Sequence, residues 1–99
     1  MESFCVSEAA LKRRIKAALE ARGCVVYPQP ATPAGITGRP DLLVCAPGGR
    51  FVALEVKTVG GRVTPAQWHQ LQRINAAGGL VAVVNSVEGA LLASIGAAV

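Results

Sequence analysis

Two short apolar runs, 41–46 (DLLVCA) and 51–58 (FVALEVKT), flank the segment PGGR. Apolar runs of this kind on either side of a Pro/Gly turn are typical of a β-hairpin. Asp41, Glu55 and Lys57 interrupt the apolar pattern, although the whole chain has only six acidic residues. These side chains are either solvated on an exposed sheet face or brought together as a site, and the rest of the chain bears on that choice.

The remaining elements follow from spacing and caps. SEAALKRRIKAALEARG predicts a first helix with Ser7 as N-cap and Gly23 as terminator, and a β-rich run, CVVYP, comes next. A second helix is predicted to begin at Thr64, with Pro65 at its first position. LVAVV, 80–84, is uniformly apolar and predicts a strand covered on both faces. A last helix is expected from near Ser86.

The element order is therefore α-β-β-β-α-β-α, and the fold class is α/β, a mixed β-sheet flanked by helices. We expect one domain, 1–99, because 99 residues suffice for a single core. If the strands 51–58 and 80–84 are parallel, the helix between them is a right-handed crossover.

Composition excludes several classes of protein. No apolar run approaches the roughly 20 residues of a membrane span, and the N-terminus has no apolar signal region, so a cytoplasmic protein is expected. Cys5, Cys24 and Cys45 are widely spaced and His69 is the only histidine, which argues against a zinc site. We interpret the cysteines as buried or half-buried small hydrophobes. Tyr27 is expected to close the core.

The chain is basic, with a net charge of +4 and a pI near 9.4, which favours a polyanionic partner. Lys12, Arg13 and Lys16 belong to the run LKRRIK, which is either a solvated helix face or a contact for the DNA backbone. Arg39 and Arg62 lie in the loops beside the hairpin, where phosphate contact is plausible.

The three charged residues of the hairpin form a chemically coherent set. Glu55 and Lys57 project from the same face of a strand, and Asp41 lies near both if 47–50 is the turn. Two adjacent carboxylates suit Mg²⁺ or Mn²⁺. A lysine beside the metal can orient or deprotonate water, so the set suffices for phosphodiester hydrolysis.

The motifs GRPDLLV and ALEVK resemble those of the PD-(D/E)xK nucleases. With a first helix that carries Glu8 and with TPAQ after the hairpin, nearly the whole chain is similar to the virus-type replication-repair nuclease (VRR-NUC) domains in stand-alone form. The resemblance implies a restriction-endonuclease-like core and a metal-dependent endonuclease of bacteriophage or bacterial type. Such enzymes are usually homodimers that act on branched DNA, including flaps and Holliday junctions.

The resemblance also implies roles for individual residues. Asp41 and Glu55 would bind the metal, with the Val56 carbonyl as a further ligand, and Lys57 would position or activate the water. Glu8 would stand at the edge of the metal site.

Gln67 would lean toward the site from the second helix. It has a structural explanation as well, because it falls at the N3 position of a capping box with Thr64. Trp68 is expected in the core or at an interface. A non-catalytic nucleic-acid-binding or replication-assembly interaction module on the same fold is the alternative function.

Overall fold

A computed structural model describes residues 7–30 and 37–96 of the chain, and Cys5 lies outside them. Within those residues the element order is α-β-β-β-α-β-α, as predicted. The elements are α1 (Glu8–Glu20), β1 (Val25–Pro28), β2 (Leu42–Ala46), β3 (Arg50–Val56), α2 (Pro65–Ala76), β4 (Leu80–Val84) and α3 (Val87–Ile95). None of these helices is long and apolar enough to cross a membrane.

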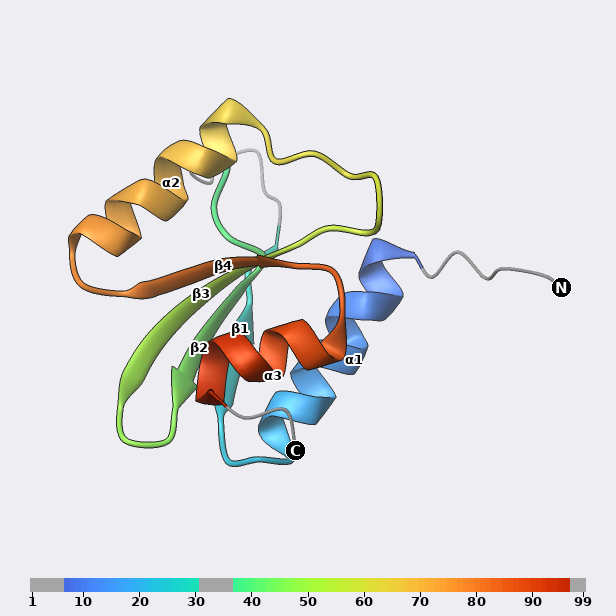
Figure 1. Cartoon of the computed structure of the whole chain (residues 1–99), viewed down its shortest axis with the longest axis vertical. Helices are drawn as coiled ribbons and strands as arrows, with labels where there is room; N and C mark the ends of the chain where they lie inside the picture. Colours follow the sequence, from blue (N-terminus) through green and yellow to red (C-terminus); the bar gives the residue numbers. More distant parts are fainter. Residues whose placement is uncertain (1–6, 31–36, 97–99) are drawn as a thin grey trace, which may run out of the picture.

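The four strands form one sheet in the order β1-β2-β3-β4. The β1–β2 and β2–β3 pairs are antiparallel, whereas β3 and β4 are parallel and are joined through α2 (Figure 1). The predicted mixed sheet flanked by helices is therefore confirmed. Because β3 and β4 are parallel, α2 runs back along the sheet between them. The beginning of α2 therefore lies close to the end of β3.

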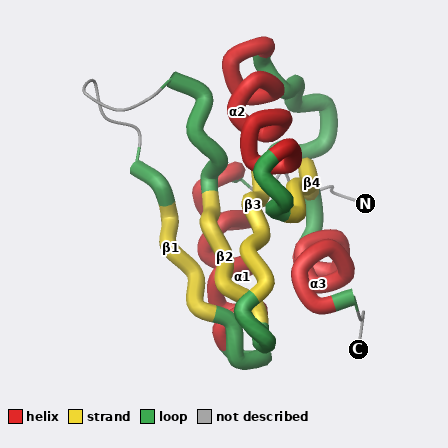
Figure 2. The backbone as a smooth tube through the Cα atoms, turned by 90° about the vertical axis from the view of Figure 1, so that its left-hand side faces the viewer, coloured by secondary structure: helices red, strands yellow, loops and turns green. Residues whose placement is uncertain are grey.

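The main core lies between one face of the sheet and the two helices α1 and α3. Ile15 and Leu19 of α1 are fully buried there, and burying a side chain of that size stabilises the fold by about 1.5–3 kcal/mol. The helices and alternate strand residues contribute the rest of this cluster: Leu11, Cys24, Val26, Leu42, Val44, Ala46, Val52, Leu54, Val56, Val84, Ala90 and Leu91. The opposite face of the sheet is left to α2, which packs on β3 and β4 (Figure 2).

The turn between β2 and β3 decides how the two strands are aligned. Ala46 pairs with Arg50, so the turn consists of residues 47–49. Gly48 and Gly49 have φ angles of +91° and +86°, which glycine adopts without the steric cost that other residues incur. The Gly49 N–H closes the turn by donating to the Ala46 carbonyl at 2.9 Å. Two glycines of the PGGR segment therefore determine the register of the whole hairpin.

The expectation that 80–84 is covered on both faces is wrong. Leu80 and Val83 are 41% and 40% exposed. β4 is the last strand of the sheet, so it has a neighbour on one side only. The helices α2 and α3 pack on this edge strand but cover it only in part. A continuous apolar run therefore does not mean here that both faces are buried.

A second difference concerns the face of the sheet on which α2 packs. The part of this face that α2 leaves uncovered is called the open sheet face. Tyr27 is 65% exposed, so it does not close the core as predicted, and Cys45 is exposed rather than buried or half-buried. Tyr27 pairs with Leu43, and Cys45 pairs with Val25 on one side and Phe51 on the other. The open sheet face consists of Val25, Tyr27, Leu43, Cys45 and Phe51.

Candidate active site

Asp41 and Glu55 meet at the end of the hairpin opposite the turn. Leu42 pairs with Leu54, so the next positions along the two strands set Asp41 against Glu55. Asp41 is held there by the backbone of the neighbouring strand, because its Oδ2 atom accepts a hydrogen bond from the Val56 N–H at 2.8 Å. The hairpin register therefore brings together the two carboxylates that the spacing of the motif predicts to be neighbours.

Glu55 is the most unusual ionisable group of the site. Its side chain is 1% exposed, and its Oε2 atom accepts a hydrogen bond from Gln67 Nε2 at 2.9 Å. Its Oε1 atom is buried and has no hydrogen-bond partner. The pKa of Glu55 is raised from its ordinary value of 4.5 to about 8 by burial and then by Asp41, while Lys57 and Lys12 act to lower it.

Lys57 lies directly after β3. Its Nζ atom is 3.7 Å from Glu55 Oε2, and its side chain is 15% exposed. The backbone of Lys57 continues the sheet, since its N–H donates to the Val84 carbonyl at 3.0 Å. The ammonium group therefore stands beside the carboxylate pair on a backbone that the sheet immobilises.

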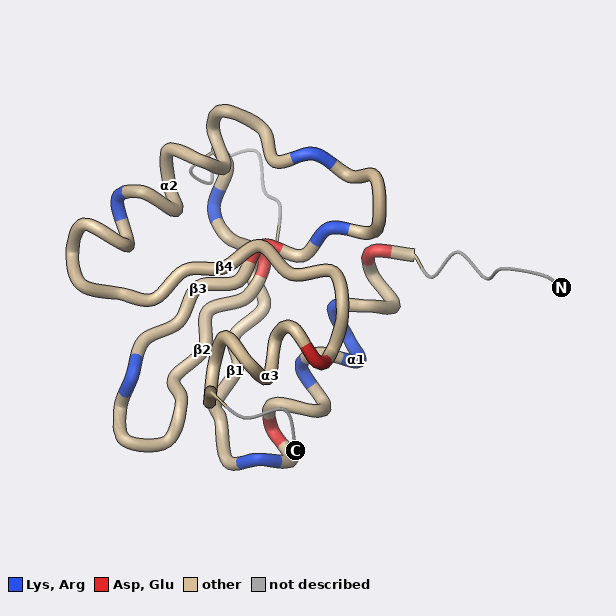
Figure 3. The backbone as a smooth tube through the Cα atoms, in the orientation of Figure 1, with Lys and Arg blue, Asp and Glu red and all other residues tan. Residues whose placement is uncertain are grey.

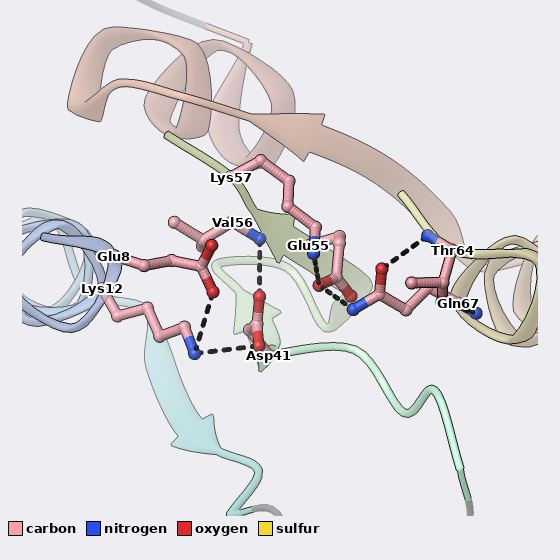
Figure 4. Close-up of polar contacts among 8 residues, drawn as sticks. All are labelled: Glu8, Lys12, Asp41, Glu55, Val56, Lys57, Thr64 and Gln67. Carbon is pink, nitrogen blue, oxygen red and sulfur yellow. Dashed lines mark hydrogen bonds and ion pairs between the residues drawn. The ribbon is translucent and has the colours of Figure 1, made fainter. Parts of the chain in front are cut away.

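Gln67 joins the site to the first turn of α2. Its Oε1 atom accepts from the Thr64 N–H at 2.9 Å, and its own N–H donates to Thr64 Oγ1 at 3.2 Å, which completes the capping box. The remaining amide nitrogen donates to Glu55. The capping and the site interpretations of Gln67 are therefore both satisfied by one side chain (Figure 4).

Gly38 is a positioning residue that the sequence analysis did not single out. Its φ is +82°, and a Cβ atom added there would lie 2.5 Å from the carbonyl carbon and oxygen of Ala66 and 2.8 Å from the Gln67 nitrogen. Only a glycine allows the loop before Asp41 to pass this close to the beginning of α2. The signal in the sequence is the glycine that opens the GRPD motif.

Helix α1 contributes one acidic and one basic side chain to the site, Glu8 and Lys12. Lys12 Nζ is 3.0 Å from Asp41 Oδ1 and 3.8 Å from Glu8 Oε1. Glu8 begins the helix, is 41% exposed and is directed at Lys12. Figure 4 shows Glu8 and Lys12 entering from α1 while Gln67 enters from α2, with the strand ends between them.

The other basic residues are spread over the molecule, some in the loops beside this centre and along α1 and others at the far end of the sheet (Figure 3). Arg39 is half-buried two positions before Asp41, whereas Arg13 and Arg62 are exposed. Lys16 forms an ion pair with Glu20 at 2.9 Å, one helical turn further along α1 than Lys12. Lys12 therefore differs from the other predicted DNA-binding residues, because it is engaged by the carboxylates of the site.

The donor atoms fit a hard divalent cation. Among residues 7–30 and 37–96, no three or more His, Cys, Asp or Glu side chains form a ready-made metal cluster. The site instead offers two adjacent carboxylates and a buried, unpartnered oxygen on Glu55. Mg²⁺ and Mn²⁺ suit such a site, because they commonly take one or two protein carboxylates and complete their coordination with water and substrate phosphate.

An open groove of about 440 Å³ adjoins the site. Lys57 lines it together with the loop 58–61, and β4 and α3 form its other walls. Asn85 also lines this groove and was not among the predicted residues. Lys57 is thus shared between this groove and the contact with Glu55.

This combination of a mixed α/β sheet with an Asp…Glu-x-Lys set at the strand ends defines a nuclease-like class of protein, and comparison with known proteins assigns the family. The family model of the VRR-NUC domain matches residues 4–88. The chain belongs to the VRR-NUC family, which is a family of nuclease domains.

Solved structures agree with this assignment. One, described as a VRR_NUC domain, is 31% identical, covers 84% of this chain and 88% of its own, and superposes with a TM-score of 0.72. A second, described as a VRR_NUC domain protein, is 17% identical with a TM-score of 0.68 over 85% of this chain and 81% of its own. The second likeness shows the fold alone. A search of curated proteins found no match.

Proposed function

We propose that this protein is a DNA endonuclease that hydrolyses phosphodiester bonds with the help of Mg²⁺ or Mn²⁺. The observation that carries the proposal is the buried Glu55 carboxylate, which faces Asp41, contacts Lys57 and has one oxygen without a partner. Ionising both carboxyl groups of a buried pair of this kind is costly unless a cation compensates them. Membership of a nuclease family supports the same conclusion.

Each residue of the site has a proposed role. Asp41 and Glu55 would hold the cation, together with the Val56 carbonyl. When bound, such a cation lowers the pKa of its water and neutralises charge on the phosphate. Lys57 positions the attacking water and stabilises the charge that develops on the phosphate. Gln67 keeps the Glu55 carboxylate in one orientation through its 2.9 Å hydrogen bond.

The proposed substrate is branched DNA, such as a flap or a Holliday junction. The net charge of +4 and the exposed cations around the site support a polyanionic substrate. Arg39 and Arg62 lie in the loops before β2 and after β3, where they would contact phosphates near the cleaved bond. Arg13 and Lys16 would contact the backbone farther away, along α1.

The protein is further proposed to act as a homodimer. The open sheet face supports this, because it presents Tyr27, Cys45 and Phe51 to solvent on neighbouring strands. Two copies would also supply the two active sites that symmetric cleavage of a junction needs. Sedimentation at micromolar concentration tests this: a 10.1 kDa species would contradict it, and Tyr27→Lys is expected to weaken a 20 kDa one.

Cleavage assays test the proposed activity. The purified protein is incubated with end-labelled linear, flapped and four-way-junction DNA, with Mn²⁺ or with EDTA. We expect cleavage in Mn²⁺ only, fastest on the branched substrates. Binding of the same DNA without cleavage, in any divalent metal, would instead support a non-catalytic nucleic-acid-binding module.

A further inference from the structure

Lys12 stands between two carboxylates at the candidate metal site. Its Nζ atom is 3.0 Å from Asp41 Oδ1 and 3.8 Å from Glu8 Oε1. The side chains of Lys12 and Asp41 are 34% and 15% exposed, so the ion pair is only partly open to water. This contact places a protein cation on a proposed metal ligand, at a shorter distance than the 3.7 Å contact of Lys57 with Glu55.

Both oxygens of Asp41 are engaged in this arrangement. Oδ2 accepts from the Val56 N–H at 2.8 Å, and Oδ1 contacts Lys12. Glu55 differs, because its Oε1 atom has no partner and Lys57 is 3.7 Å from the other oxygen. Glu55 therefore has one oxygen that no protein cation occupies, whereas Asp41 has to exchange its contact with Lys12 for one with the metal.

Simple electrostatics favours the exchange of Lys12 for the metal at Asp41. Mg²⁺ binds a carboxylate oxygen at about 2.0–2.1 Å. An ammonium that stays 3.0 Å from Asp41 would then lie within a few ångströms of a divalent ion, and like charges at that separation repel strongly in a partly buried site. Lys12 is able to leave, since its side chain is long and Glu8, four residues before it on α1, offers another carboxylate.

We propose that Lys12 is an internal counter-ion of Asp41, which balances this carboxylate in the metal-free protein and competes with the divalent metal for it. This inference rests on the proposed function, since it presupposes a metal site at Asp41 and Glu55. Lys12 is thus a positioning residue that sets the concentration of metal at which the site fills. The same contact stabilises the Asp41 carboxylate in the metal-free fold.

Calorimetric titration of Mn²⁺ into EDTA-treated, dialysed protein tests the inference without relying on activity. Lys12→Gln is expected to bind Mn²⁺ roughly fivefold to tenfold more tightly than wild type, because no ammonium has to be displaced. The thermal midpoint of the same variant without metal is expected to fall. A merely structural role would lower the midpoint and weaken Mn²⁺ binding together.

Lys16→Gln is the matched control. It removes the same charge from the same helix, but Lys16 pairs with Glu20 rather than with the site, so its Mn²⁺ affinity should equal that of wild type. Lys12→Arg retains the cation and can bind a carboxylate through two hydrogen bonds, so it should bind Mn²⁺ no more tightly than wild type.

The outcomes separate this inference from the proposed function. Unchanged or weaker Mn²⁺ binding by Lys12→Gln, or tighter binding by Lys12→Arg, would overturn the role of Lys12. If wild type still binds Mn²⁺ and Asp41→Asn does not, the metal site itself would stand. A wild-type protein that binds no Mn²⁺ would overturn both.

Discussion

Gln67 donates a hydrogen bond to Glu55 at 2.9 Å while the same side chain caps the helix that carries it. The position of α2 is thereby tied to the buried carboxylate of the site. A change in the first turn of α2 is therefore expected to affect both stability and chemistry, and the two effects can be separated by substitution.

Gln67→Ala and Thr64→Ala separate them. Each removes part of the capping box, and we expect each to cost about 0.5–2 kcal/mol of stability. Only Gln67→Ala also frees Glu55 Oε2, so only this variant should lose cleavage activity, by at least about tenfold. Thermal melting and single-turnover cleavage provide the two measurements. Equal activity of the two variants would show that Gln67 serves the helix alone.

Gly38→Ala tests the close approach between the loop before Asp41 and α2. The added Cβ would lie 2.5 Å from the Ala66 carbonyl group, so α2 and Gln67 have to move. Gly48→Ala is the control, because Gly48 has a similar positive φ but nothing within 4 Å of the added atom. We expect the control to cost about 1–2 kcal/mol and Gly38→Ala about 1–3 kcal/mol more, measured by urea unfolding. A similar cost for both would mean that the contact with α2 is easily relieved.

Asp41 has a structural and a chemical task, and two substitutions distinguish them. Asp41→Asn retains an oxygen that can accept from the Val56 N–H, whereas Asp41→Ala leaves that N–H without its acceptor. Both variants should lose metal-dependent cleavage, but only Asp41→Ala should lose about 1–3 kcal/mol of stability in urea unfolding. If Asp41→Asn is as unstable as Asp41→Ala, the ion pair with Lys12 matters more than the backbone contact.

Glu55 makes the stability of the metal-free protein depend on pH. Its pKa is about 8 in the folded state and 4.5 ordinarily, so the folded protein holds a proton that the unfolded chain releases in this range. The contribution of Glu55 is therefore complete below about pH 4.5 and falls as pH rises toward 8, by up to about 1.4 kcal/mol per pH unit. The difference in the free energy of unfolding between wild type and Glu55→Gln, measured in urea at several pH values, isolates the contribution of Glu55. A constant difference between the two proteins across the window would contradict it.

Addition of Mn²⁺ is expected to change this dependence. Metal binding requires the ionised carboxylate, so the apparent Mn²⁺ affinity should rise with pH through the same window and the metal should restore stability near pH 8. Calorimetric titration at several pH values measures the effect. An Mn²⁺ affinity that does not change between pH 6 and 8 would show that Glu55 is already ionised without metal.

Parts of this fold could be predicted because they depend on local chemistry. The caps at Ser7 and Thr64 and the apolar spacing of Leu11, Ile15 and Leu19 determine where helices begin and which side is buried. The motif around Asp41 and Glu55 likewise places both residues on neighbouring strands. These features need only the sequence near each residue.

Other parts depend on contacts between distant segments. The register across residues 47–49 follows from the backbone conformation of Gly48 and Gly49, which spacing alone does not determine. The approach of Gly38 to α2 and the pairing of Lys12 with Asp41 join different elements. The exposure of Tyr27 follows from the size of α2, which covers only part of its sheet face.

The central claim is that Lys57 and the Asp41–Glu55 pair form one catalytic unit, and single-turnover cleavage of a four-way junction in Mn²⁺ by Lys57→Ala tests it most directly. Lys16→Ala serves as the control for the lost charge. We expect Lys57→Ala to fold and bind the junction normally but to cleave it at least about 100-fold more slowly than wild type. Cleavage by Lys57→Ala at the wild-type rate would contradict the proposed mechanism.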